Sequence, residues 1–473
     1  MATELISQIL SPTNATYING VSAERRFSRA LLENTFQKLV EKDGKGVNDT
    51  WVSEDDATHA AQVFVNRIKP VKMQSREMGA SKNGGSYSAN QNYSQTETVA
   101  IDILQVVDDP ILIPRARQDM IPTDLVSKQI EIFSARLATI LNGATVASKL
   151  LAVYDTERKG GNVNKKTITS TDISNKEVAL RFIEANSLLD EGDQEHGIDI
   201  FPEDSRIAVF KVSYRPILKG AGVLVIGGAN DAYDILRKGG IDKEATPRKA
   251  EDGFIGSIDG IDVHIISNES LIHASTFMGF PEGELKASPF AGYLASSYAN
   301  ARGVSSAERV QTVQEVNGQG VRLLPYVKFG VASWYPLGIV AISNATYNPL
   351  NDLKTLFGAS LATVTFKLKG AGSRLYPTDA TFASVGASAF TVNGLAANDD
   401  WNVDHLVAVK YFVGTAAVTT LDGFAKGYAA ATYKGDVTVG SAVSTTIADT
   451  NYVNILAISD DGSIALFHTQ YEA

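Results

Sequence analysis

The segment DLVSKQIEIFSARLATILNGATVASKLL, at residues 124–151, predicts one long helix around which the rest of the chain can be organised. Its apolar residues recur at gaps of four and three, a spacing that places them along one side of a helix. At a rise of about 1.5 Å per residue, the helix would be roughly 42 Å long. The main apolar stripe consists of Val126, Ile130, Phe133, Leu137, Ile140, Ala144, Ala147 and Leu151. A thinner second stripe consists of Leu125, Ile132, Gly143 and Leu150. Two interpretations remain open: a large core helix, or a spine that braces an extended subunit.

The composition narrows the classes of protein to consider. A chain of 473 residues is expected to form about two to four domains. It is 44% hydrophobic and 20% charged, so it can bury real cores. A net charge of −10 argues against broad nucleic-acid binding through a basic face. The absence of cysteine removes disulfides, thiolate metal sites and a cysteine nucleophile. Neither a signal peptide nor a membrane span is expected from the apolar runs.

The segment before the long helix predicts an arm, a hairpin and a linker. Residues 22–41 have the pattern of an amphipathic helix that ends at Gly44 and Gly46. Strand-like runs at 61–71 and 98–107 flank a long polar loop. Because a two-stranded ribbon is marginal alone in water, we expect a neighbour to support it.

Arginines near these segments are candidate contacts. Arg25, Arg26 and Arg29 lie near the start of the arm helix, where they could meet nucleic acid or a partner's carboxylates. A solvated face is the commoner outcome for such a run. Prolines between 108 and 122 indicate an extended linker that carries Arg115 and Arg117.

The segment after the long helix has a mixed pattern. A second helix is expected at 174–192, after a polar link at 165–172. Further strands are expected at 206–212 and 222–228, the latter followed by a short helix. Asp259-Gly260 predicts the turn of a hairpin over 255–266. Residues 176–320 therefore predict an α+β domain.

The last part of the chain has a different sequence pattern. Residues 327–342 predict a strand pair bent at Pro336 that packs on the long helix, and 349–359 predict a linker or a short helix. Beyond about residue 360 only short strand patterns with glycine turns recur. They predict a separate small β-sandwich or barrel over 360–473.

No pattern of catalytic or metal-binding residues emerges. The glycines in VLVIGGAND, at 223–231, fit a tight strand-to-helix turn better than a phosphate loop. No two histidines have the spacing of metal ligands. Glu191, Asp193 and Glu195 fit a solvated acidic turn better than a calcium loop. We therefore expect no enzyme activity, no metal and no cofactor.

The order of these parts resembles the major capsid protein of tailed phages, whose Johnson fold is shared with herpesvirus shells. Three stretches carry the resemblance: ALRFIEANSLLDEGD with EDSRIAVFKVSYRPILKG, FIGSIDGIDVHIISNESL, and FGVASWYPLGIVAI. The matching positions are Leu188, Leu189, Arg206, Val209, Tyr214 and Leu218, then Gly256, Ile258, Gly260, Val263, Ser267, Asn268 and Leu271. The chain departs from the pattern where Val212 and Ser213 replace the usual proline before the tyrosine. The added domain at 360–473 is similar to those of larger phages such as the crAss-like gut phages.

The resemblance implies an α+β fold with a defined division of the chain and an extra C-terminal all-β domain. The implied parts are an N-terminal arm (1–58), an extended E-loop hairpin (59–108), a P-domain with the spine helix (109–175), an A-domain (176–320), return strands of the P-domain (321–355) and the extra β domain (360–473). It also implies inter-subunit contacts from the E-loop. These contacts would come from Lys72, Met73, Arg76, Tyr87 and Tyr93.

The implied function is self-assembly. Subunits would form hexamers and pentamers of an icosahedral head shell around double-stranded DNA, without sequence-specific binding and without a membrane. Implied partners are the portal vertex and scaffolding, auxiliary or decoration and head-fibre proteins. The protein would be located in the virion after assembly in the host bacterial cytoplasm.

Two alternatives remain. One is an encapsulin-like nanocompartment shell, although the polar loop and the extra domain argue against it. The other is a carbohydrate-binding or adhesive surface protein, in which 360–473 would offer Trp401, Tyr411 and Tyr433 as aromatic platforms.

Overall fold

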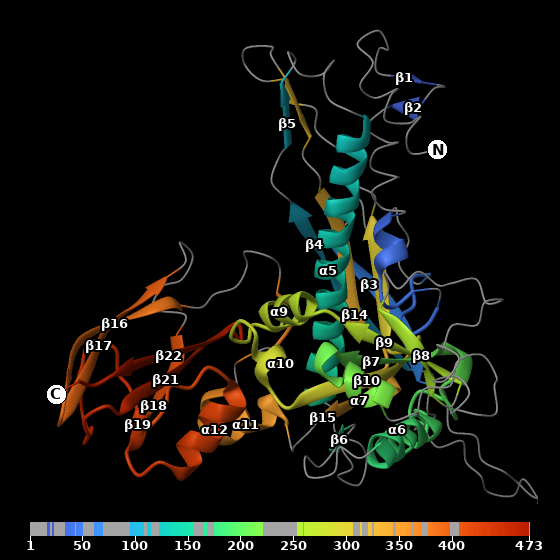
Figure 1. Cartoon of the computed structure of the whole chain (residues 1–473). Coiled ribbons are helices and arrows are strands. Elements are labelled where there is room, and N and C mark those ends of the chain that lie inside the picture. The colour runs from blue at the N-terminus through green and yellow to red at the C-terminus, as the bar shows by residue number, and fades with distance from the viewer. Residues whose placement is uncertain are drawn as a thin grey trace, which may run out of the picture.

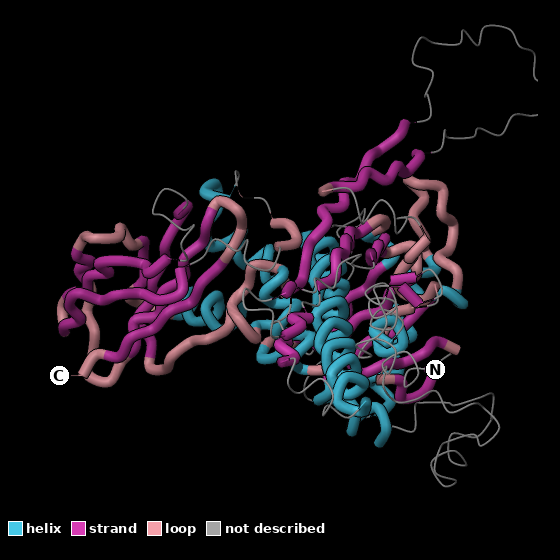
Figure 2. Tube along the Cα trace, turned by 90° about the horizontal axis from the view of Figure 1, so that it is seen from above, coloured by secondary structure: helices cyan, strands magenta, loops and turns pink. Residues whose placement is uncertain are grey.

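The computed structural model has a body built around one long helix, with a C-terminal β domain beside it (Figure 1). Seen from above, the strands of the C-terminal domain gather to one side of the body (Figure 2). The mixed α+β fold class is confirmed. The structure describes residues 17–18, 21–22, 34–42, 44–50, 61–69, 95–107, 111–114, 123–155, 165–167, 175–220, 253–258, 260–305, 313–314, 320–323, 326–343, 347–361, 364, 366–369, 377–397 and 406–472.

Helix α5 (Thr123–Asp155) confirms the predicted long helix and extends it at both ends. Phe133 and Leu137 are buried and Ile140 is half-buried, as the main stripe requires. Val126 and Ile130 lie in the helix, but their side chains are outside the described part. The segment Glu131–Tyr154 is long and apolar enough to cross a membrane, yet 83% of an 18-residue stretch within it is buried inside the protein, as in a core helix.

The second stripe is buried only in part. Leu150 is fully buried, whereas Ile132 is 53% exposed. The reason is that residues 141–151 are all buried, whereas the turns before them are covered on one side only. At Gly143 the partner is α9 (Asn268–Phe277), because an added Cβ would lie 2.7 Å from the Cβ of His273. A glycine allows this close crossing of two helices.

A six-stranded sheet packs beneath the helix with the order β6-β15-β10-β7-β9-β8. Its strands are β6 (Lys165–Thr167), β7 (Arg206–Lys211), β8 (Phe254–Ile258), β9 (Ile261–Ile266), β10 (Phe290–Ser296) and β15 (Ile339–Ser343). The predicted strand at 206–212 and the hairpin at Gly260, where φ is +77°, are confirmed. The predicted polar link is wrong at β6, because parallel pairing with β15 makes it a strand.

The second predicted helix is α6 (Asn175–Asp190), which is confirmed. It is followed by the short helix α7 (Arg215–Gly220). The strand and short helix expected between 222 and 240 lie outside the described residues.

The predicted hairpin is present as β3 (Gln62–Lys69) and β4 (Gln95–Val107), which we call the ribbon. It is not confined to two strands. The base of β4 also pairs with β14 (Tyr326–Ser333), and β14 pairs with β11 (Asn300–Ser305). The neighbour that we expected to support the ribbon is therefore, at its base, a strand of the same chain.

Two neighbouring predictions concern the chain on either side of this sheet. The predicted strand pair around Pro336 is wrong as a pair, because β14 and β15 belong to different sheets and Pro336 begins a short turn between them. The proline-rich linker contains a strand, β5 (Ile111–Pro114). It pairs with β13 (Gly320–Leu323), which in turn pairs with β12 (Val313–Gln314).

The arm was predicted to be a helix over 22–41, and the described residues match this only in part, with residues 23–33 lying outside the described part. Ser22 belongs to a short strand, β2 (Val21–Ser22), which pairs with β1 (Tyr17–Ile18), and the visible helix occupies 34–38. The following residues lie against the body, where Leu39 and Val47 are fully buried. The described residues that follow this helix therefore pack on the body.

The C-terminal domain contains two sheets packed face to face, as a β-sandwich requires. One sheet contains β16 (Pro377–Gly386), β17 (Ala389–Ala397) and β20 (Ala442–Ser444). The other contains β18 (Leu406–Gly414), β19 (Lys434–Asp436), β21 (Tyr452–Ser459) and β22 (Ile464–Gln470). Phe390, Tyr411 and Ile455 share the core between the sheets, so Tyr411 is not an exposed aromatic platform.

Two predictions for this domain are corrected. It is not all-β, because Thr420 caps a helix, α12 (Leu421–Ala430). Glycines and alanines weaken the apolar period of that helix, which hid it in the sequence. It is also not separate, since Phe412 and Phe424 share a core with α5 and with α11 (Pro349–Phe357). For residues 349–359 the sequence predicted a linker or a short helix, and α11 confirms the helix.

Candidate assembly surfaces

The matching positions of the resemblance are mostly core positions. Arg206 is 1% exposed at the start of β7. Its guanidinium donates to Asn186 at 2.5 Å, to Asp190 at 2.7 Å and to the carbonyl of Phe201 at 3.0 Å. This arginine ties α6 to the central sheet, and a buried guanidinium needs such partners. Leu188, Leu189, Val209, Tyr214 and Leu218 are also buried.

The outer face of the ribbon carries an exposed aromatic residue that a partner could cover. Phe64 of β3 is 62% exposed and lies opposite Ala100 of β4. On either side, Gln62 donates to Asp102 at 2.7 Å and Thr98 donates to Asn66 at 2.8 Å. An aromatic ring with a polar rim is the usual composition of a protein interface.

The inner face of the ribbon packs on the body. Val63, Val65, Val99 and Ile101 join a small apolar cluster around Trp334. The alternation of buried and exposed side chains follows the period of two along a strand. The ribbon therefore presents one face to its own chain and leaves the other open.

Ionisable groups anchor the end of the ribbon that is next to the loop between β3 and β4. Arg67 of β3 donates to Glu97 of β4 at 2.7 Å and to the carbonyl of Trp334 at 2.6 Å. His196 lies between Asp193, at 2.7 Å, and Glu97, at 3.4 Å. Asp193 is 2% exposed, so the acidic turn predicted as solvated is instead partly buried against the ribbon. The direction of the ribbon is thus fixed by the body.

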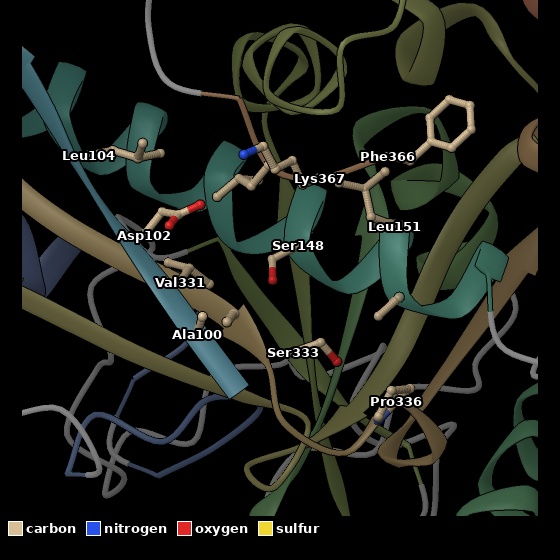
Figure 3. A pocket seen from close by; sticks show the side chains of 13 residues that line it. Ala100, Asp102, Leu104, Ser148, Leu151, Val331, Ser333, Pro336, Phe366 and Lys367 are labelled. Carbon is tan, nitrogen blue, oxygen red and sulfur yellow. The ribbon is translucent and has the colours of Figure 1, made fainter. Parts of the chain in front are cut away.

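A groove continues the outer face toward the C-terminal domain (Figure 3). It has a volume of about 320 Å³ and is lined by β4, α5, β14 and the segment 366–368. Ala100, which pairs with Phe64, also lines the groove. Figure 3 shows Asp102, Lys367 and Ser148 around it. The groove and Phe64 therefore form one continuous surface, which we call the outer surface.

A buried charge cluster fastens the arm to the long helix. Lys149 of α5 and Tyr293 of β10 both donate to the carboxylate of Glu41. Arg302 donates to Asp49 at 2.7 Å and to the backbone carbonyl of Glu41 at 2.9 Å. Burial lowers the pKa of Lys149, and the carboxylate of Glu41 partly opposes this decrease. Burial raises the pKa of Tyr293. No local sequence pattern signals this cluster.

Several predicted contact residues cannot be placed. The E-loop residues Lys72, Met73, Arg76, Tyr87 and Tyr93 lie outside the described residues. The same holds for Arg25, Arg26 and Arg29 of the arm and for Arg115 and Arg117 of the linker. Among the residues that the structure describes, no group of His, Asp or Glu is arranged to hold a metal ion.

Together these features define an α+β chain with an anchored ribbon that is open on one face, and with a C-terminal β domain. Comparisons with known proteins find no matching protein-family model and no matching curated protein. Among solved structures, the capsid of Ralstonia phage GP4 is similar at 13% identity and a TM-score of 0.43, over 67% of this chain and 91% of that one. The capsid of Cyanophage P-SCSP1u is similar at 12% identity and a TM-score of 0.40, over 71% and 99%. A virus-like particle from Pyrococcus furiosus is similar at 11% identity and a TM-score of 0.36, over 68% and 100%.

Proposed function

We propose that this chain is a shell subunit, the major capsid protein of a tailed phage, which assembles through hexamers and pentamers into an icosahedral head around double-stranded DNA. The observation that carries the proposal is the outer surface. An edge strand with an exposed aromatic residue is a liability unless another chain covers it. Here that strand, β3, belongs to a ribbon that Arg67 and His196 anchor near its loop end. A closed shell supplies a neighbour for every copy of such a surface.

Phe64→Ser tests this proposal. Because Phe64 is 62% exposed, its loss should leave the subunit folded while shells fail to form. Phe64→Leu is the matched control, since it keeps an apolar side chain at the same place and should still assemble. Circular dichroism reports folding, and electron microscopy with size-exclusion chromatography reports shells. Normal shells from Phe64→Ser would contradict the role of the outer surface.

Deleting residues 73–95 is a second test of the ribbon. This deletion removes the polar loop between the two strands and should also give a folded subunit that assembles wrongly or not at all. Normal shells from the deletion would contradict the predicted inter-subunit contacts of Met73, Arg76, Tyr87 and Tyr93, which the deletion removes.

The alternatives differ in what the particles contain. DNA inside the shells supports the capsid protein, whereas a protein cargo supports an encapsulin-like compartment. A soluble monomer that binds sugars and forms no shells would favour the adhesive protein. The net charge of −10 fits DNA that is enclosed without being gripped. Location in the virion and contacts with a portal vertex and with scaffolding, decoration and head-fibre proteins belong to the same proposal.

The type of phage is a narrower hypothesis. The C-terminal β domain is the feature by which the sequence resembles crAss-like gut phages. Identifying the genome inside purified particles would test it.

A further inference from the structure

The joint between the body and the C-terminal domain contains a buried carboxyl group. Glu284 begins α10 (Glu284–Ala287) and is fully buried. One carboxyl oxygen accepts from the backbone N–H of Leu421, the first residue of α12, at 2.7 Å. The other accepts from the hydroxyl of Tyr347 at 3.1 Å. A side chain of the body thus completes the N-terminus of a helix in the C-terminal domain.

We propose that this joint is a pH-responsive connection, in which the C-terminal domain is held firmly while Glu284 is protonated and is held more loosely once Glu284 is ionised. The proposal does not depend on shell formation, because all the groups involved belong to one chain.

The surroundings of Glu284 disfavour its charge. Burial is the main cause that raises its pKa to about 7, and the carboxylate of Asp422 in α12 acts in the same direction. Hydrogen bonds from Leu421, Tyr347 and the backbone of Asp422 oppose this rise but do not cancel it. Desolvation of a carboxylate commonly outweighs a few neutral donors.

The other charged or titratable groups around the joint do not reverse this balance. From β7, Lys211 donates to the carbonyl of Ser288 at 2.9 Å, and burial lowers its own pKa to about 8. From α5, Tyr154 stays neutral, since burial and Glu284 raise its pKa well above the usual value. Tyr347, just before α11, behaves likewise. Helix α9 contributes the hydroxyl of Ser275, which accepts from the backbone of Leu285 at 3.0 Å.

A neutral carboxyl group fits the observed hydrogen bonds. One oxygen can still accept from Leu421 while the protonated oxygen donates to the hydroxyl oxygen of Tyr347. Ionisation keeps the acceptor for Leu421 but places a charge in a buried site beside Asp422. Loss of the proton therefore weakens the joint without breaking a specific hydrogen bond.

Other contacts keep the domain attached at every pH. Lys369 donates from its backbone to the carbonyl of Phe277 at 2.8 Å, and its side chain bonds to Asp461. The backbone N–H of Ile464 donates to the carbonyl of Gly279 at 2.7 Å. The response should therefore be confined to the side of the joint formed by α12.

The direction of the pH effect follows from linkage. When the joint opens, Glu284 meets water and its pKa returns to the model-compound value of 4.5, whereas it is about 7 in the closed joint. The closed joint binds the proton more tightly, so closure weakens as pH rises between these two values and is constant outside them. One proton changes the closing equilibrium by tenfold per pH unit inside this range, which amounts to about 70-fold between pH 5 and pH 8.

Hydrogen exchange of the full chain measures this equilibrium. After correction for intrinsic exchange rates, protection of the amides in residues 421–430 should fall about 70-fold from pH 5 to pH 8. The peptide 175–190 in α6, far from the joint, should show little change. Protection of 421–430 that does not vary with pH would overturn the proposal.

Two variants identify the responsible group. Glu284→Gln keeps an acceptor for Leu421 but cannot ionise, so protection should become independent of pH. Glu282→Gln, on the exposed side of the same turn, should behave as the unmodified chain. If Glu284→Gln does not fold, Asp422→Asn should move the pH response to lower values, because it removes a charge that raises the pKa of Glu284. A pH response that persists in Glu284→Gln, or is unmoved in Asp422→Asn, would overturn the assignment.

Discussion

Replacing Lys149 by Met tests how the arm is fastened to the long helix. The side chain of Lys149 is fully buried and that of Glu41 is 3% exposed, so both charges of the pair are out of water. Methionine keeps most of the aliphatic stem and removes only the ammonium group. The Glu41 carboxylate then stays buried and keeps its hydrogen bond from Tyr293. It loses the positive charge that Lys149 of α5 had placed beside it.

The expected loss of stability is large. Stranding one member of a buried ion pair costs about 3–5 kcal/mol, against a total of roughly 5–15 kcal/mol for a typical folded domain. Glu41→Gln in the same chain removes the stranded charge, and its amide oxygen can still accept from Tyr293. The double variant should therefore be more stable than the sum of the single losses by about 2–3 kcal/mol.

The assay is urea unfolding of unassembled subunits as a double-mutant cycle. It compares the unmodified chain, Lys149→Met, Glu41→Gln and the double variant. Lys45→Met is the matched control in the same arm, because Lys45 pairs with Asp262 at 2.6 Å but keeps 32% of its side chain exposed. A pair this exposed should cost less than about 1 kcal/mol. Losses for Lys149→Met and Glu41→Gln that simply add, within about 0.5 kcal/mol, would refute the coupling.

Two further substitutions in α5 test the packing of the long helix. Gly143→Ala should lower the free energy of unfolding by about 1–2 kcal/mol, because overpacking at the backbone of Ser270, 2.8 Å from the added Cβ, exceeds the gain in helix propensity. Ala135→Gly, at an exposed position of the same helix, is the control that measures helix propensity alone, with an expected loss of about 1 kcal/mol. If Gly143→Ala stabilised the protein, the close crossing of α5 and α9 would be contradicted. Leu137→Asp should prevent folding, because it places a carboxylate at a position where the residue is only 3% exposed. Ala135→Asp is its exposed control, and expression as soluble, cooperatively melting protein would show that Leu137 is not in the core.

Local patterns in the sequence were sufficient for several elements. The gaps of four and three around Phe133 and Leu137 place side chains on one side of a helix whatever the partner is, so α5 was predictable. The Asp259-Gly260 pair made the turn between β8 and β9 predictable in the same way, and Gly260 has the positive φ that such a turn requires. The exposure of Ile132 was not predictable in this way, because periodicity shows which residues share a face but not whether that face is covered.

The candidate assembly surfaces were predictable only in part. The two strands of the ribbon and the polar segment between them follow from sequence pattern. The exposure of Phe64 does not, since Val63 and Val65 have the same apolar character and only the position of Trp334 decides which face is covered. The pairing of β4 with β14 joins segments more than two hundred residues apart, so no local pattern could reveal it.

The sequence by itself determined the features that depend on the geometry of the backbone over a few residues: the long helix, the ribbon strands, the tight hairpin and the short strands near the C-terminus. Only the tertiary structure decided what each element meets. It brought Glu41 to Lys149 and Glu284 to Leu421, and it joined the C-terminal domain to the core of the body. The physical reason is that hydrogen bonding and side-chain direction within an element repeat with a fixed period, whereas burial and charge pairing depend on groups that folding brings together from distant parts of the chain.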